Sequence, residues 1–170
     1  MSKAMLRRAD AQTIAISFTL NGRHQELAVE PHELLLDVVR ERLGLTGVKR
    51  SCDVEVCGAC TLLVDGRPVS ACTTLAFEVR GCSVMTIEGL ADNGKLHPLQ
   101  EAFIEHGGFQ CGFCTPGMIL AAKALLDENP NPTEDELKHF MHGNICRCTG
   151  YKKIIESIMA AAKLMRENRT

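Results

Sequence analysis

The sequence is poor in aromatic residues and lacks any long hydrophobic run. Phe, Trp and Tyr make up 4% of the 170 residues, and Trp is absent. The hydrophobic share is nevertheless 45%, so we expect a folded chain whose core is packed mainly by Leu, Ile, Val, Ala and Met. No apolar stretch approaches the roughly 18 residues that a bilayer span needs, and we expect no membrane-spanning segment.

The sequence also lacks an excess of charge of one sign and a dinucleotide-binding motif. The formal net charge is -2 and no basic block is present, which argues against nucleic acid as a partner because phosphate binding needs clustered Lys and Arg. Without a Gly-x-Gly-x-x-Gly motif, we expect neither FAD nor NAD to bind this chain alone. Arg7-Arg8 could begin an export signal, but polar residues interrupt the segment that follows, so we predict a strand there and a cytoplasmic location.

Cysteine, in contrast, is abundant. Of nine cysteines, eight fall into two groups of four, and Cys82 is left over. In a reducing compartment this pattern indicates metal or redox chemistry rather than disulfides. Because two complete sets exist without Cys82, we expect that residue to be an ordinary thiol.

Alternating hydrophobicity dominates the N-terminal half. Residues 13–20 alternate with the period of a half-buried strand, and Asn21-Gly22 is a strong hairpin signal. A helix is predicted from Pro31 to about Leu43, ended by Gly44. Further strands are predicted at residues 24–29, 61–64, 67–72 and 83–90. The pattern indicates a small mixed sheet packed on a helix.

After a linker at residues 91–98 the pattern becomes helical. A first helix is predicted from Pro98 to Gly107-Gly108, and Asn129–Pro132 breaks the chain between the second and third helices. Three helix starts are predicted from capping signals: Thr115 followed by Pro116, the Thr133–Glu136 capping box, and Thr149. The two halves together predict an α+β chain.

The first cysteine group reads C-x4-C-x2-C, with a fourth cysteine after a hairpin: Cys52, Cys57, Cys60 and Cys72. This is the spacing of plant-type [2Fe-2S] ferredoxins. Gly58 and Ala59 are small, so backbone N–H groups can approach cluster sulfur atoms there. A structural zinc site, the alternative, usually uses two C-x2-4-C pairs, so the layout favours iron–sulfur.

The second group consists of two separated pairs, Cys111 and Cys114, then Cys146 and Cys148. Their spacing indicates only a metal or redox site. Both pairs precede predicted helices, whose free N–H groups and positive dipole ends suit an anionic thiolate cluster. We therefore favour a second [2Fe-2S] site, with zinc as the alternative.

Three motifs together resemble the iron–sulfur subunit of the xanthine oxidase family of molybdenum hydroxylases. They are GLTGVKRSCDVEVCGACTLLVDG, QCGFCTPGMI and GNICRCTGY, and the resemblance runs from about Thr13 to about Ala162. It implies a β-grasp ferredoxin-like domain at residues 10–90 and an all-α four-helix bundle at residues 91–166. Each domain would hold one [2Fe-2S] cluster.

The resemblance also implies residue roles and partners. The first cluster would be held by Cys52, Cys57, Cys60 and Cys72, and the second by Cys111, Cys114, Cys146 and Cys148. Gln110 and Cys148 would lie beside the molybdopterin of a large partner subunit. Electrons would pass from molybdenum through both clusters to FAD on a medium subunit, within a dimer of heterotrimers.

Two other functions fit parts of the sequence. A free-standing ferredoxin would need only the first half of the chain, and it would commonly be more acidic than this chain. A zinc-stabilised interaction module would contain the cysteines without redox chemistry. Iron and sulfide content separates the module from the other two functions, and co-purification with larger subunits separates the relay from the ferredoxin.

Overall fold

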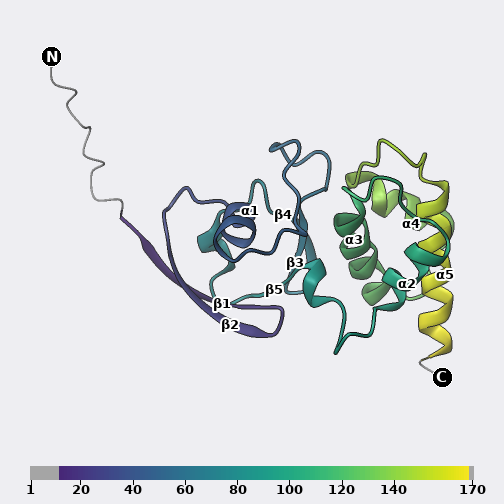
Figure 1. The fold of residues 1–170 in the computed structure, drawn as a ribbon, viewed down its shortest axis with the longest axis horizontal. Helices are drawn as coiled ribbons and strands as arrows, with labels where there is room; N and C mark the ends of the chain where they lie inside the picture. The colour runs from purple at the N-terminus through teal and green to yellow at the C-terminus, as the bar shows by residue number, and fades with distance from the viewer. Residues whose placement is uncertain (1–11, 169–170) are drawn as a thin grey trace, which may run out of the picture.

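The N-terminal half of the chain is a five-stranded mixed sheet, as seen in a computed structural model that describes residues 12–168 (Figure 1). Its strands are β1 (Ile14–Leu20), β2 (Arg23–Val29), β3 (Thr61–Val64), β4 (Arg67–Ser70) and β5 (Ser83–Met85). Their order in the sheet is β2-β1-β5-β3-β4. The β1–β5 pair is parallel and the other pairs are antiparallel. The Arg7-Arg8 pair lies outside the described residues.

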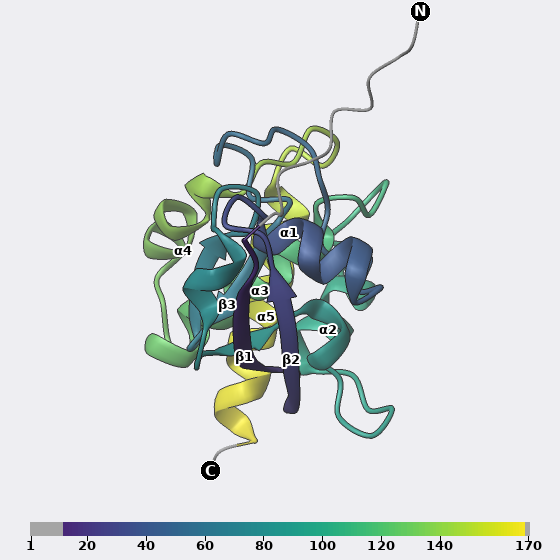
Figure 2. The same cartoon turned by 90° about the vertical axis from the view of Figure 1, so that its left-hand side faces the viewer.

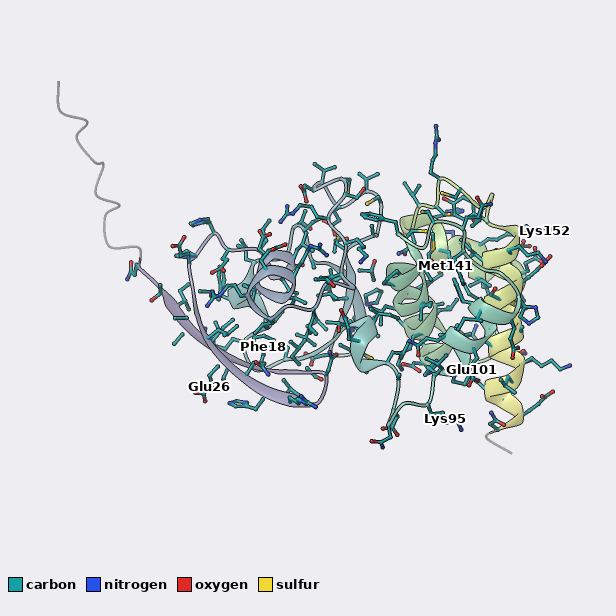
Figure 3. All side chains as sticks on the ribbon, in the orientation of Figure 1. Phe18, Glu26, Lys95, Glu101, Met141 and Lys152 are labelled. Carbon is teal, nitrogen blue, oxygen red and sulfur yellow. The ribbon has the colours of Figure 1, made fainter. Side chains whose placement is uncertain are left out.

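The predicted β1–β2 hairpin is confirmed. Asn21 and Gly22 take positive φ angles of 50° and 77°, which the tight turn requires. Alternate residues of β1, namely Ile16, Phe18 and Leu20, are buried in the sheet core. Figure 3 shows Phe18 in this half of the molecule. The alternation in the sequence therefore correctly predicts which face of β1 is buried.

The helix predicted from Pro31 to Leu43 is wrong in its first turn and in its type. A short α1 (Leu35–Asp37) continues into a π-helical turn (Val38–Arg42). Leu34 stays extended because it forms a β-bridge with Leu75. Because of this pairing, the helix begins at Leu35 and not directly after Pro31.

The last predicted strand, residues 83–90, is also too long. β5 ends at Met85, and a 3-10 turn (Ile87–Gly89) follows. Between them, the Thr86 N–H donates to Asn21 Oδ1 at 2.8 Å, so it bonds to a side chain instead of a strand carbonyl. The strand signal of this segment is therefore overridden by one side-chain contact.

Four helices make up the C-terminal half: α2 (Pro98–Glu105), α3 (Thr115–Glu128), α4 (Glu134–Phe140) and α5 (Lys152–Glu167). They lie behind the sheet in Figure 2. The predicted capping box at the start of α4 is confirmed, because Thr133 Oγ1 accepts from the Glu136 N–H and the Glu136 carboxylate accepts from the Thr133 N–H. Within residues 12–168, no helix has both the length and the apolar character to cross a membrane.

Helix α3 joins the two halves because it contributes side chains to two hydrophobic cores. Leu120 and Ala124 pack into the core under the sheet. Met118 and Ile119 pack into the core among the helices, which also contains Met141 (Figure 3). The chain is thus an α+β fold whose sheet half and helical half share one helix.

Candidate iron–sulfur sites

The first cysteine group lies in the long loop before β3 and just beyond β4. Cys60 directly precedes β3 and Cys72 follows β4, so the β3–β4 hairpin brings the two together, with the Ala71 N–H donating to the Cys60 carbonyl at 3.4 Å. Both side chains are buried, whereas Cys52 and Cys57 are half-buried. The expectation that the hairpin returns the fourth cysteine to the loop agrees with this arrangement.

Two opposite electrostatic environments exist within this first group. The backbone N–H groups of Val54, Val56 and Cys57 donate to the Cys52 sulfur and lower its pKa to about 6. Burial raises the pKa of Cys60 to about 12. A thiol as buried as Cys60 loses its proton readily only when a metal ion compensates the charge.

The second group is assembled from the loops before α3 and α5. Cys148 Sγ lies 3.6 Å from Cys111 Sγ, and both residues are exposed. Cys114, at the N-terminus of α3, faces the buried Cys146. Burial raises the pKa of Cys114 to about 12. The sequence prediction that both pairs precede helices is confirmed.

The eight cysteines come together two by two. Sγ atoms interact within the pairs Cys52–Cys57, Cys60–Cys72, Cys111–Cys148 and Cys114–Cys146. In residues 12–168, no three Cys, His, Asp or Glu side chains converge on a position for a single metal ion. Paired thiols fit a [2Fe-2S] cluster, in which each of the two iron atoms takes two protein ligands.

Thr149 and Tyr151 hold the loop around Cys146. The Thr149 N–H and hydroxyl donate to Cys146 Sγ at 3.4 and 3.2 Å, and the Tyr151 hydroxyl accepts from the Cys146 N–H at 3.0 Å. Burial disfavours the Cys146 thiolate, but the hydrogen bonds from Thr149, the Cys148 backbone and the Cys114 side chain together lower its pKa. These side chains are part of the site, and sequence reasoning did not identify them as such.

Two predicted helix caps are wrong. The N-cap of α5 is Tyr151, with φ of 68°, because Thr149 is turned toward Cys146. The N-cap of α3 is Cys114 rather than Thr115. The Thr115 hydroxyl oxygen is buried and has no hydrogen-bond partner within the described part of the chain. A hydroxyl in this position, next to Cys114, fits an acceptor supplied by a bound cluster.

Two other sequence predictions concern single residues. Gln110 is exposed directly beside the exposed Cys111. Cys82 lies at the start of β5, away from both groups, where its sulfur contacts the Arg80 carbonyl at 3.9 Å and the Asp65 side chain. The structure therefore keeps Cys82 apart from the paired cysteines.

Comparison with known proteins defines the class of protein first. Residues 18–85 match the family described as 2Fe-2S iron-sulfur cluster binding domain, and residues 86–159 match the family described as [2Fe-2S] binding domain. The fold and these two matches define a protein with two [2Fe-2S] clusters.

Individual relatives then define the family. The chain is 49% identical over 150 residues to the nicotinate dehydrogenase small FeS subunit of Eubacterium barkeri, covering 88% of this chain and 96% of that protein. It is 45% identical to the nicotine 6-hydroxylase small subunit of Paenarthrobacter nicotinovorans, covering 92% and 94% of the two chains. The chain belongs to the small iron–sulfur subunits of the xanthine oxidase family of molybdenum hydroxylases.

Solved structures and a longer relative support this family assignment. A chain of quinoline 2-oxidoreductase from Pseudomonas putida 86 superposes with a TM-score of 0.88 at 47% identity, over 94% of this chain and 99% of that chain. The aldehyde oxidoreductase of Megalodesulfovibrio gigas is 47% identical over 86% of this chain but only 16% of its own length. The same unit thus occurs both as a separate subunit and within a longer polypeptide.

Replacing Thr149 by valine is expected to make the second cluster harder to reduce. The change removes the hydroxyl that donates to Cys146 Sγ while keeping the size of the side chain. If the bond is stronger to the reduced cluster than to the oxidised one by about 1 kcal/mol, its loss makes the potential about 40 mV more negative for a one-electron couple. A redox titration followed by EPR measures the shift. The Thr149→Ser variant keeps the hydroxyl and should match the wild type; an unshifted potential in Thr149→Val would contradict the prediction.

Proposed function

We propose that the chain relays electrons from a molybdopterin centre to FAD, with both of these cofactors on partner subunits. When bound, the two [2Fe-2S] clusters supply one-electron donors and acceptors. The observation that carries the proposal is the pairing of all eight cysteines in two sets, in loops that contact each other across the two halves of the fold. The protein residues fix the spacing, burial and hydrogen bonding of these sites.

The proposed ligands follow from the pairs. For the first cluster they are Cys52, Cys57, Cys60 and Cys72, and for the second Cys111, Cys114, Cys146 and Cys148. Burial of Cys60, Cys72 and Cys146 supports the assignment, because a bound cluster then sits at least partly shielded from water. Within each set, one pair is more exposed than the other, so each site has a side that faces solvent or a partner.

The exposed side of the second site is the proposed contact with molybdopterin. Cys111 and Cys148 are exposed there, and Gln110 is exposed next to them. We propose that Gln110 and Cys148 lie beside the pterin of the large subunit. The hydrophobic side chains of Phe109, Phe113 and Ile145 are exposed in the same loops, and such apolar exposure is typical of surfaces that a partner covers.

The remaining expectations on assembly belong to the same proposal. We propose a large molybdopterin-binding subunit, a medium FAD-binding subunit, a dimer of heterotrimers and a cytoplasmic location. The relatives' names support separate subunits: small subunit, subunit gamma and subunit beta. These names also give different substrates, among them nicotinate, nicotine and caffeine, which supports substrate chemistry in another subunit.

The division of the chain is proposed as well. We propose a β-grasp ferredoxin-like domain at residues 10–90 and a four-helix bundle, built from α2 to α5, at residues 91–166. The two hydrophobic cores support two units, and α3 contributes side chains to both of them.

Iron and acid-labile sulfide per chain, measured on anaerobically purified complex, test the function together with EPR after dithionite reduction. Roughly four iron and four sulfide with two distinct [2Fe-2S] signals, in a preparation that contains two larger subunits, is the expected result. Zinc in place of iron would support an interaction module. Two clusters on a chain that purifies alone would support a free-standing carrier, and either result would overturn the relay.

A further inference from the structure

A buried asparagine connects the two cysteine sites. Asn144 is 7% exposed and lies two residues before Cys146, in the helical half of the fold. Its Nδ2 donates across the boundary to the Gly58 carbonyl at 3.1 Å and to Thr61 Oγ1 at 3.2 Å. Gly58 lies between Cys57 and Cys60, so the asparagine of one cysteine loop binds the backbone of the other.

The orientation of the Asn144 amide is set by its acceptors. Thr61 Oγ1 already donates its proton to the Gly58 carbonyl at 2.7 Å, so it can only accept from Asn144. A carbonyl and a hydroxyl lone pair therefore both face the amide, and only an NH₂ group serves both. An aspartate carboxylate has the same shape but no hydrogen to donate, so its oxygen would face these two acceptors without a hydrogen bond.

Other contacts hold the two peptide groups on either side of Gly58. The Ile145 N–H donates to the Cys57 carbonyl at 2.9 Å. A Cβ at Gly58 would lie 2.5 Å from the Gly143 carbonyl oxygen, and a Cβ at Gly117 would lie 2.3 Å from the Gly58 carbonyl oxygen. The Cys57–Gly58–Ala59 segment is thus enclosed by the second cysteine loop and by α3, and Asn144 provides the side-chain contact to its Gly58 carbonyl.

We propose that Asn144 is a positioning residue that sets the separation and relative orientation of the two cluster sites. The inference rests on the proposed relay. Electron transfer between fixed centres depends steeply on their separation, so a shift of the Gly58 backbone relative to Cys146 alters the transfer rate. Gly58 would keep its hydrogen bonds to the Thr61 N–H and hydroxyl without Asn144, so the first loop retains its local fold while losing its link to the second.

The test uses Asn144→Ala and Asn144→Asp in the intact complex. EPR of the fully reduced sample reports the magnetic coupling between the two clusters, which depends on their distance and orientation, and rapid reduction kinetics report the transfer rate between them. We expect both clusters to be present, their coupling to change, and the transfer to slow by about tenfold or more, as misplacement of reacting groups commonly produces. Asn131→Ala, at an exposed asparagine between α3 and α4, is the control and should match the wild type.

Two results would overturn the inference and leave the relay intact. One is an Asn144 variant with both cluster signals but wild-type coupling and rate. The other arises if the Asn144 variants do not assemble: Thr61→Val then removes one acceptor while keeping the side-chain shape, and unchanged coupling in that variant contradicts the role. Absence of two [2Fe-2S] signals in the wild type would instead refute the proposed function.

Discussion

Replacing Cys57 by alanine is expected to abolish the first [2Fe-2S] cluster and to leave the second in place. The change removes one thiolate of the Cys52–Cys57 pair, so one iron atom loses half of its protein ligands. The backbone carbonyl of Cys57, which accepts from the Ile145 N–H, is unaffected. Iron content should fall from roughly four to roughly two per chain, with one EPR signal remaining.

Cys82→Ala is the matched control for this prediction. Cys82 is half-buried like Cys57, but its sulfur contacts Arg80 and Asp65 rather than another cysteine. We expect full iron content and both EPR signals in this variant. Loss of both clusters from Cys57→Ala would show that the two sites do not load independently, and loss of iron from Cys82→Ala would contradict the ligand assignment.

Gly117→Ala is expected to destabilise the contact between the two halves. In an ordinary helix this change would stabilise by roughly 1 kcal/mol, because alanine has the higher helix propensity. Here the new Cβ would lie 2.3 Å from the Gly58 carbonyl oxygen, a backbone atom that is itself held by Asn144 and Thr61. Overpacking of this kind costs about 1–3 kcal/mol or more, so we expect the free energy of unfolding to fall by about 2 kcal/mol.

Denaturant unfolding of the purified holo-protein measures this effect, with Gly143→Ala as the control. Gly143 lies in the same contact region, yet a Cβ there would meet nothing within 4 Å and its φ is not positive. We expect Gly143→Ala to remain within about 0.5 kcal/mol of the wild type, as surface substitutions do. Equal stability of the Gly117→Ala and Gly143→Ala variants would show that α3 can move away from the first cysteine loop without cost.

Local signals in the sequence predicted much of the fold. The β1–β2 hairpin followed from strict alternation and Asn21-Gly22, and the start of α4 followed from the Thr133–Glu136 capping box. In these cases the residues that determine the structure are neighbours in the chain. The spacing of the first cysteine group likewise favoured an iron–sulfur site, because three of its cysteines lie in one short motif, whereas the spacing of the second group indicated only a metal or redox site.

Predictions failed where a contact outside the expected pattern outweighed a local preference. Thr149 was predicted to cap α5, but its hydroxyl donates to Cys146 Sγ instead. The bridge between Leu34 and Leu75 keeps Leu34 extended, so α1 begins later in the chain than Pro31 predicts. The role of Asn144 could not be read from the sequence at all, since its hydrogen-bond partner Gly58 is 86 residues away. No short-range pattern encodes such a contact.

The pairing of the cysteines has a consequence for the order in which the protein matures on the ribosome. The proposed ligands of the first site come from one loop and the adjoining hairpin, so that set is complete once the chain has passed β4 to Cys72. The second site joins Cys111 to Cys148, 37 residues later, and cannot close until nearly the whole helical half has been synthesised. A cluster held by these proposed ligands would cross-link the chain, and the entropic benefit of a cross-link grows with the length of chain it closes. We therefore expect the second cluster to be inserted after the first.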